Sequence, residues 1–337
     1  MFTILKGFLA TVIRLLASEA GNVTIEQTWV YRFHDLLHLT YQQQGSLLEG
    51  KIDPMMVHRN VGGAIDHHER LGNVIANDTV SPFGQTKILN PEHSRRAATL
   101  QSSDAAVLVS DEHTLRSMVE PGDGYTQTIV FALGRRADLH CINAAANPAT
   151  TATVAEGTGV ITYGTVALPA SHVINPGTAT TAIDNATINK AHGLLSAASV
   201  PVGAGERCML YHPTQEEDIK SITQATSSDF TARMIYDKGT INEVPWNGFT
   251  WVNIADVVAP DLSKLQNMLP SAEAGSRALL AIHKSALGLS IGRDITTKIN
   301  ERPDLNNSIQ IRSLMMQAAV RVWEGGVVRI DAAGSTT

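Results

Sequence analysis

The sequence contains only two cysteines, Cys141 and Cys208, in 337 residues. They lie far apart and form neither a CxxC pair nor a spacing typical of zinc ligands. One disulfide could join them, but two buried thiols of a protein made in a reducing cytosol are the favoured interpretation. We therefore expect both cysteines to be free and buried.

The sequence also lacks long apolar runs and an excess of positive charge. No stretch reaches the roughly 18–20 apolar residues of a membrane-spanning helix. The 26 basic and 32 acidic residues give a net charge of −6, which argues against a surface built to neutralise phosphates. Any nucleic-acid partner is expected to be enclosed by the protein rather than bound by a basic surface. The hydrophobic content of 43% is that of an ordered globular protein.

Sequence motifs of catalysis are missing as well. There is no P-loop, no G-x-S-x-G and no local Cys/His signature. Gly157-Thr158-Gly159 is a fragment of a dinucleotide-binding fingerprint without its third glycine or a following helix, so it predicts a turn. We expect no catalytic, cofactor-binding or metal-binding residues, no cofactor, and no enzymatic activity.

Two groups of histidines are the only candidates in the sequence for a metal-binding or acid/base site. His34 and His38 have the i, i+4 spacing of helical metal ligands, but the glutamate and third ligand of a metal-dependent hydrolase are missing. Residues 66–69 read Asp-His-His-Glu. Successive side chains of an extended segment point to opposite faces, so these four are expected not to converge. A metal-dependent hydrolase remains an alternative that rests on His34 and His38.

The first twenty residues permit two interpretations. An apolar run at 7–16, preceded by Lys6, imitates a secretory signal, which would make the chain a secreted Ala/Thr-rich binding protein cleaved near Ala20. Arg14 interrupts that run, however. The apolar residues fall on one helical face, which favours an amphipathic arm helix. A capping box at residues 24–27 then predicts a second helix that ends near Gly45.

Residues 47–103 predict a two-stranded excursion that projects from the body. Turn residues interrupt short apolar runs there, and the charges are mixed and balanced. More than fifty residues of structureless loop would be unusual inside a compact domain. Two strands alone are marginally stable in water, so such an arm needs a neighbour to lie on.

The remaining sequence alternates between helices and strands. A strand at 104–110 precedes a long helix that opens at 121–124 and ends before Pro148. The uncharged, Ala/Thr-rich residues 149–187 predict short strands and loops on the surface of a second subdomain. A helix at 189–199, a strand at 207–211 and a helix after Pro213, with acidic residues in its first turn, follow.

The last sixty residues predict a return to β structure, and the whole pattern indicates a mixed α+β architecture. The candidate strands are residues 278–282, 286–291, 295–299, 309–314, 318–323 and 327–331. Glu324-Gly325-Gly326 between the last two strands predicts a hairpin.

The order of these segments resembles the major capsid proteins of tailed bacteriophages with the Hong Kong 97 fold, and among them a podovirus-type branch. The resemblance is carried by residues 41–48 (Tyr-Gln-Gln-Gln-Gly-Ser-Leu-Leu), 104–109, 131–138 (Phe-Ala-Leu-Gly-Arg-Arg-Ala-Asp), 281–288 and 325–331. No one of these stretches is a fixed signature, and the specificity comes from their order and spacing. Residues 1–21 and 149–187 have no counterpart in the family pattern.

This resemblance implies a structural protein that assembles into hexamers and pentamers of an icosahedral head enclosing double-stranded DNA. It divides the chain into an N-terminal arm (1–46), an extended E-loop (47–103), a peripheral domain with a spine helix (104–148), an axial domain with the Ala/Thr-rich insert (149–277) and C-terminal strands that complete both domains (278–337). The implied partners are other copies, a scaffolding protein, a portal and a candidate decoration protein, but no membrane. The implied location is the virion, after assembly in the host cytoplasm.

Overall fold

The structure is a computed structural model that describes residues 42–78, 84–110, 122–155, 158–175, 182–203, 205–222, 241–242, 245–258, 265–270 and 276–333. Its helices are α3 (Gly122–Ala146), α4 (Asn185–Ala197) and α5 (Glu216–Ser221). Its strands are β1 (Val57–Arg59), β2 (Ile65–Leu71), β3 (His93–Thr99), β4 (Gln101–Val109), β5 (Ala149–Val154), β6 (Ile161–Val166), β7 (Val173–Ile174), β8 (Arg207–Tyr211), β9 (Pro245–Trp246), β10 (Phe249–Asn253), β11 (Val257–Val258), β12 (Leu265–Gln266), β13 (Ser276–His283), β14 (Leu287–Arg302), β15 (Ser308–Arg321) and β16 (Val327–Ala333). The architecture is α+β, as the sequence predicts.

A six-stranded sheet in the order β7-β16-β13-β8-β10-β9 forms the centre of the body. Its strands bury both faces, because alternate side chains enter different cores. In β8, Met209 and Tyr211 join a core with Trp251 and the inner face of α4. Leu210, between them, joins a second core with Leu280 and the C-terminal half of α3. The sheet therefore forms the middle layer between helices.

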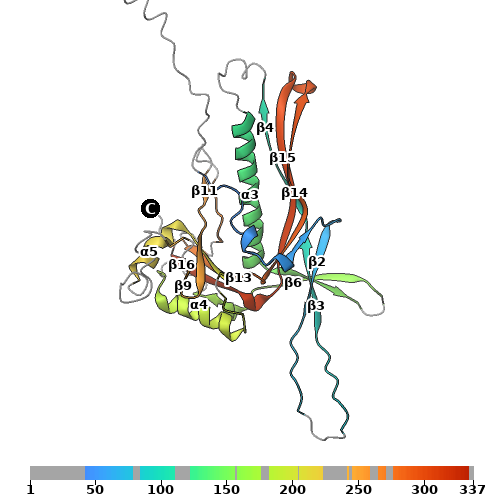
Figure 1. Cartoon of the computed structure of the whole chain (residues 1–337), viewed down its shortest axis with the longest axis vertical. Helices are drawn as coiled ribbons and strands as arrows, with labels where there is room; N and C mark the ends of the chain where they lie inside the picture. Colours follow the sequence, from blue (N-terminus) through green and yellow to red (C-terminus); the bar gives the residue numbers. More distant parts are fainter. Residues whose placement is uncertain are drawn as a thin grey trace, which may run out of the picture.

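The long helix α3 lies along a four-stranded sheet of order β1-β14-β15-β4 (Figure 1). Leu133 and Ala137 of the helix pack against Met315 of β15. The helix ends at Ala146, just before Pro148, whose ring disfavours helical backbone at the preceding residue. Figure 1 shows the helix and the long strands β4, β14 and β15 rising side by side from the body.

Residues 42–48 cross α3 in close contact with its backbone. Gly45, at a φ of +75°, lies against Gly134, where an added Cβ would stand 2.6 Å from the Gly45 carbonyl carbon. The adjacent carboxylate of Asp138, which is fully buried, accepts hydrogen bonds from the backbone N–H groups of Leu47 and Leu48. This crossing fixes where the chain enters the body.

Gly134→Ala is expected to lower the free energy of unfolding by about 1–3 kcal/mol, because the new methyl group meets backbone atoms that cannot rotate away. Gly193 supplies the matched control. It also lies inside a helix, but a Cβ there meets nothing within 4 Å, so Gly193→Ala should stabilise the chain by about 0.5–1 kcal/mol. Urea unfolding of both variants measures the difference. Equal shifts of the same sign would contradict the crossing.

The strands β2 and β3 form an antiparallel hairpin that projects from the body (Figure 1). The pairing runs from Ile65 opposite Thr99 to Leu71 opposite His93. Residues 47–60 do not project: Leu48 and Ile52 are buried in the second core, and β1 pairs with β14. The projecting part is therefore confined to residues 65–99.

The Ala/Thr-rich segment forms strands; β7 joins the central sheet, but β5 and β6 lie in a different place from the one predicted. β5 pairs with β6, and Thr151 of β5 pairs with Arg96 of β3, which gives a sheet of order β2-β3-β5-β6. The sequence placed this segment on a second subdomain. β5 instead follows α3 after a two-residue turn, and this brings it beside the root of the projecting hairpin.

Most local predictions are confirmed. The long helix, the strand 207–211 and the acidic first turn of α5 lie where the sequence places them. α4 begins earlier than predicted, because Asp184 caps it by accepting a hydrogen bond from the Thr187 backbone N–H. The predicted strand pairs 286–291/295–299 and 309–314/318–323 are each one continuous strand, β14 and β15. The break predicted at residues 292–294 appears in β14 as shifts of the strand register between Ile291 and Thr296.

The hairpin predicted around Glu324-Gly325-Gly326 is wrong. β15 and β16 belong to different sheets, and the 3-10 turn at Glu324–Gly326 carries the chain from one to the other. An added Cβ at Gly326 would stand 2.6 Å from the Cβ of Ala286. The glycine therefore permits close packing against the turn between β13 and β14 rather than a reversal of two paired strands.

Both cysteines are free and buried, as predicted. Burial raises the pKa of the Cys141 and Cys208 thiols, which keeps them protonated and unreactive. In the described part of the chain, no helix has the length and apolarity needed to cross a membrane. The predicted helices at 1–21 and 24–45 fall outside the described residues, apart from 42–45 at the end of the second.

Candidate functional site

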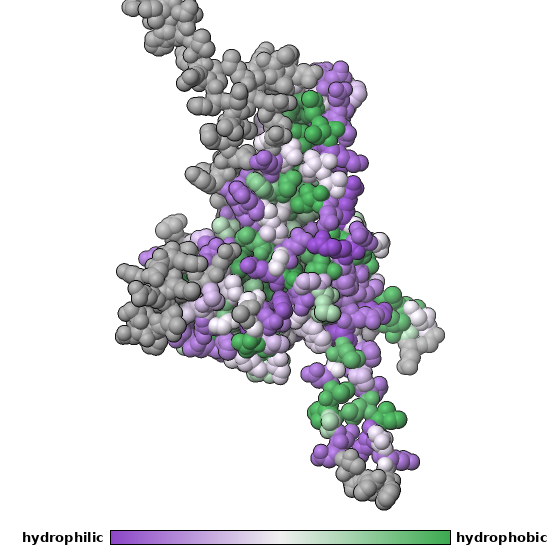
Figure 2. All heavy atoms as spheres, viewed as in Figure 1, coloured by the Kyte–Doolittle hydropathy of each residue, from purple (hydrophilic) through white to green (hydrophobic). Residues whose placement is uncertain are grey.

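The distal end of the projecting hairpin exposes apolar side chains. Ile75 is 87% exposed and Ile88 is 94% exposed, and Leu71, Val74 and Leu89 are also open to solvent. Figure 2 shows hydrophobic atoms gathered on this arm below the body. Scattered single apolar residues on a surface are ordinary, but a contiguous group on an arm indicates a surface that is covered in the working state.

A second exposed apolar group lies on the β5–β6 hairpin. Every residue of β6 is exposed, and among the described strands it pairs only with β5. Val160, Ile161 and Tyr163 are between 41% and 57% exposed. The described part of the hairpin carries no charge and no proline that would protect an open strand edge from pairing with another chain.

Two arginines and a glutamate fasten the root of the projecting hairpin. Glu324 accepts hydrogen bonds from Arg70 of β2, at 2.6 Å, and from Arg96 of β3. The guanidinium of Arg70 also lies 5.3 Å from the ring centre of Trp323. Burial raises the pKa of the Glu324 carboxyl, but the hydrogen bond from Arg70 and the charges of both arginines more than offset this, so its pKa lies below the ordinary value. The pairs thus tie the hairpin to the turn between β15 and β16.

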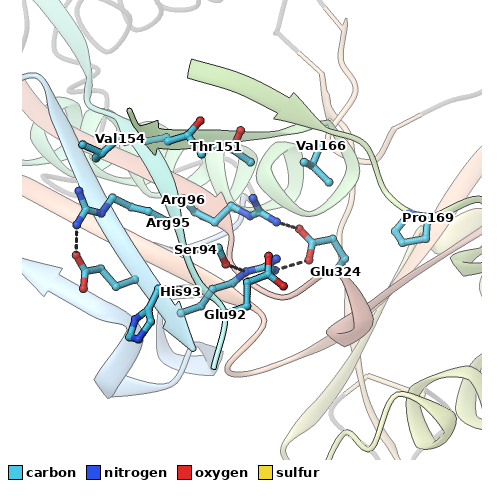
Figure 3. A pocket seen from close by; sticks show the side chains of 14 residues that line it. Glu92, His93, Ser94, Arg95, Arg96, Thr151, Val154, Val166, Pro169 and Glu324 are labelled. Carbon is cyan, nitrogen blue, oxygen red and sulfur yellow. Dashed lines mark hydrogen bonds and ion pairs between the residues drawn. The ribbon is translucent and has the colours of Figure 1, made fainter. Parts of the chain in front are cut away.

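A cleft of about 760 Å³ lies beside this anchor, between the strands β2–β3 and the hairpin β5–β6 (Figure 3). Three carboxylates line it. Glu324 is held by two arginines and Glu69 pairs with Arg95, so neither is free to act as a general base or a nucleophile. The third, Glu92, is exposed to solvent, so the shielded carboxylate of the cleft is the one that serves the anchor.

A second polar cluster lies on the same face of β2 as Arg70, because residues 66, 68 and 70 of the strand point to one side. The Asp66 carboxylate accepts hydrogen bonds from His58 Nδ1 of β1, at 2.7 Å, and from the Ser290 hydroxyl of β14, at 2.6 Å. His68 Nε2 lies 2.9 Å from the Ser290 oxygen. Because the hydroxyl proton goes to Asp66, the imidazole is the donor in that last bond. Among the described residues, His58, Asp66 and His68 could hold a metal ion together.

The sequence prediction for residues 66–69 is confirmed in part. Successive side chains do alternate, so the four do not converge, and Glu69 pairs instead with Arg95. Asp66 and His68 nevertheless share a face, and His58 joins them from another strand. Sequence spacing alone gave no signal for His58. His34 and His38 lie outside the described residues, whereas Thr158 and Gly159 form a turn, as predicted.

Burial and then the electrostatic effect of His58 lower the pKa of His68 from 6.5 to about 4, against the opposing charge of Asp66. Between these values the unfolded chain binds a proton that the folded chain does not, so stability falls as the pH falls from 6.5 to 4. His68→Gln should reduce the slope of unfolding free energy against pH in this window by up to about 1.4 kcal/mol per pH unit. The exposed His93 supplies the control substitution His93→Gln. An unchanged slope in His68→Gln would contradict the assignment.

Comparison with known proteins identifies the family of the chain. Residues 25–333 match the model of a family described as phage capsid protein. The chain belongs to the phage capsid protein family. This capsid protein has no match among curated protein sequences.

Solved capsid structures share the fold of this capsid protein. The capsid of cyanophage P-SCSP1u aligns with a TM-score of 0.64 at 15% identity, over 92% of this chain and 95% of that chain. The capsid of Ralstonia phage GP4 aligns with a TM-score of 0.63 at 11% identity, over 92% and 96%. That of cyanophage Pam1 aligns with a TM-score of 0.58 at 9% identity, over 92% and 98%.

These matches confirm the main prediction from the sequence. The chain is a major capsid protein with an α+β fold of Hong Kong 97 type, a structural component of the virion rather than an enzyme. The two alternatives, a metal-dependent hydrolase and a secreted Ala/Thr-rich binding protein, receive no support. The podovirus-type branch stays a prediction.

Proposed function

We propose that this capsid protein assembles into hexamers and pentamers of an icosahedral head, and that its projecting hairpin lies on a neighbouring copy. The observation that carries the proposal is the exposure of Ile75 and Ile88 at the end of that hairpin. A neighbouring copy that covers both would remove about 1.5–3 kcal/mol of unfavourable hydration for each side chain. Contacts of this modest size are sufficient in a closed symmetric shell, because every copy repeats them.

The same proposal assigns a part of the capsid subunit to each segment of the chain. Residues 1–46 serve as the N-terminal arm and 47–103 as the E-loop, of which only 65–99 project. Residues 104–148 form the peripheral domain, and 149–277 form the axial domain around the symmetry axes of each ring, apart from the β5–β6 hairpin beside the E-loop. The strands after 278 complete both domains, β14 and β15 the first and β13 and β16 the second. The support for this division is the fold alone, in which α3 lies along the strands of the chain's C-terminal part.

The ion pairs at the root of the hairpin support a role of the arm in holding neighbouring copies together. Glu324 joins Arg70 and Arg96 from two strands, so a force on the arm is transmitted to the turn between β15 and β16. Hydrogen-bonded ion pairs that are largely shielded from solvent, as these are, are costly to break from one side. An arm that only hung in solvent would need no such attachment.

Further partners and the site of assembly complete the proposal. A scaffolding protein and a portal are expected partners, and a decoration protein is a further candidate. The net charge of −6 supports enclosure of double-stranded DNA without sequence-specific contacts. Two free, buried thiols suit assembly in the reducing cytoplasm of the host.

Sedimentation velocity of the purified chain over rising concentration tests this proposal. We expect discrete species of five or six copies and closed shells at higher concentration, with few intermediate sizes. A chain that stays monomeric at every concentration, alone and with a scaffolding protein, would contradict the proposal.

A further inference from the structure

We propose that His58, Asp66 and His68 form a binding site for a divalent transition-metal ion of the zinc class, at the joint between the projecting hairpin and the body. One ligand atom from each residue lies within 4.8 Å of the other two. The inference concerns the unassembled chain, so it does not rest on the proposed shell role.

The set of ligand atoms selects the class of ion. Two imidazole nitrogens and one carboxylate oxygen suit Zn²⁺, Co²⁺ and Ni²⁺, whereas Mg²⁺ and Ca²⁺ prefer oxygen ligands alone. Three protein ligands leave a fourth position of a tetrahedral ion for water. Most structural zinc sites have four protein ligands, so this site would hold an exchangeable ion rather than one required for folding.

The distances between the ligand atoms are close to those that an ion requires. Asp66 Oδ2 lies 2.7 Å from His58 Nδ1 and 3.7 Å from His68 Nε2. Bonds of about 2.0–2.1 Å around a tetrahedral ion place neighbouring ligand atoms roughly 3.3 Å apart, between these two distances. The two imidazole rings are stacked with their centroids 4.2 Å apart and their planes 9° apart, so one ring must turn out of the stack before both nitrogens can point at one ion.

The two histidines are suited to that movement in different ways. His68 is 3% exposed, and its ring covers Gly288 so closely that a Cβ there would stand 2.6 Å from it, which fixes the ring in place. The side chain of His58 is 40% exposed and can swing outward. The site thus combines one fixed ligand with one adjustable ligand.

Metal ligands must be deprotonated at the atom that binds the ion. His58 Nδ1 and His68 Nε2 donate hydrogen bonds to Asp66 and Ser290 in the metal-free chain, so a bound ion would take the place of those two protons. The Ser290 hydroxyl would hold Asp66 in place from the second shell of the ion.

Such an ion would connect two parts of the fold. His58 belongs to β1, which pairs with β14 of the body, with His58 opposite Ser290. Asp66 and His68 belong to β2 of the projecting hairpin. A metal bridge would fix the angle at which the hairpin leaves the body.

Isothermal titration of the chelator-stripped, unassembled chain with Zn²⁺ at pH 7.5 tests the inference. We expect one equivalent to bind and His58→Gln to weaken binding by about 100-fold or more. The visible absorption of Co²⁺ bound to the wild-type chain should be lost in the same variant. His58 is substituted because it is the exposed ligand, and Asp66→Asn serves as a second variant if His58→Gln does not fold.

Two controls separate this site from other histidines. His93→Gln alters an exposed histidine of the same hairpin, and the double substitution His34→Gln/His38→Gln removes the pair with helical metal-ligand spacing. Both variants should keep full affinity. The inference is overturned if Zn²⁺ does not bind stoichiometrically, or if binding survives in His58→Gln and is lost in the His34/His38 variant.

Discussion

Replacing Asp138 by alanine is expected to lower the free energy of unfolding of the unassembled chain by about 3–5 kcal/mol. The Asp138 carboxylate is fully buried and accepts hydrogen bonds from the backbone N–H groups of Leu47 and Leu48, the Ser46 hydroxyl and the Gln43 side chain. Alanine would leave the buried Leu48 N–H and the partly buried Leu47 N–H without this acceptor. The crossing of residues 42–48 over α3 would then lose its attachment, and with it the point where the N-terminal arm meets the body.

The matched control is Asp104→Ala. Asp104 also pairs across elements, with Arg312, but both side chains are more than half exposed, so its loss should cost no more than about 1 kcal/mol. Urea unfolding followed by circular dichroism measures both variants. If Asp138→Ala unfolds within 1 kcal/mol of Asp104→Ala, the buried crossing does not stabilise the fold as described.

The double substitution Ile75→Asp/Ile88→Asp is expected to raise the protein concentration needed for assembly by about 100-fold or more. Each isoleucine that a neighbour covers contributes about 1.5–3 kcal/mol, and each copy would take part in such a contact twice, once with its own hairpin and once as the receiving surface. The fold of the single chain should not change, because both side chains are exposed in it.

Asn73→Asp/Gln85→Asp provides the control for charge. Both residues are exposed on the same hairpin, and the two substitutions add the same two negative charges without removing apolar surface. Light scattering during assembly compares the two double variants with the unsubstituted chain. Equal inhibition by both would assign the effect to charge repulsion, and normal assembly of the isoleucine variant would contradict the proposed contact.

The sequence predicts those features whose causes are local. The end of α3 follows from Pro148, and the acidic first turn of α5 from the helix dipole. The projecting hairpin follows from its length, its balanced charges and its interrupted apolar pattern. The free thiols follow from the small number of cysteines. Each of these features is determined within a window of residues that a single sequence displays.

The site residues that sequence reasoning missed are brought together by pairing between distant segments. His58 and Asp66 are close in sequence, but they meet beside Ser290 because β1 pairs with β14, more than two hundred residues later. Asp138 meets Leu48 across ninety residues. Neither pairing has a local pattern, because the buried partner is chosen by packing rather than by spacing. The hairpin predicted from the glycines at 325 and 326 was wrong for a similar reason, because close packing and strand reversal both favour glycine.

Electron cryo-microscopy of particles assembled from this capsid protein tests the central claim most directly. The projecting hairpin, residues 65–99, should lie across a neighbouring copy, with the side chains of Ile75 and Ile88 buried in that contact. A closed shell in which both isoleucines remain exposed to solvent, or a chain that forms no closed particle with its scaffolding partner, would contradict the account.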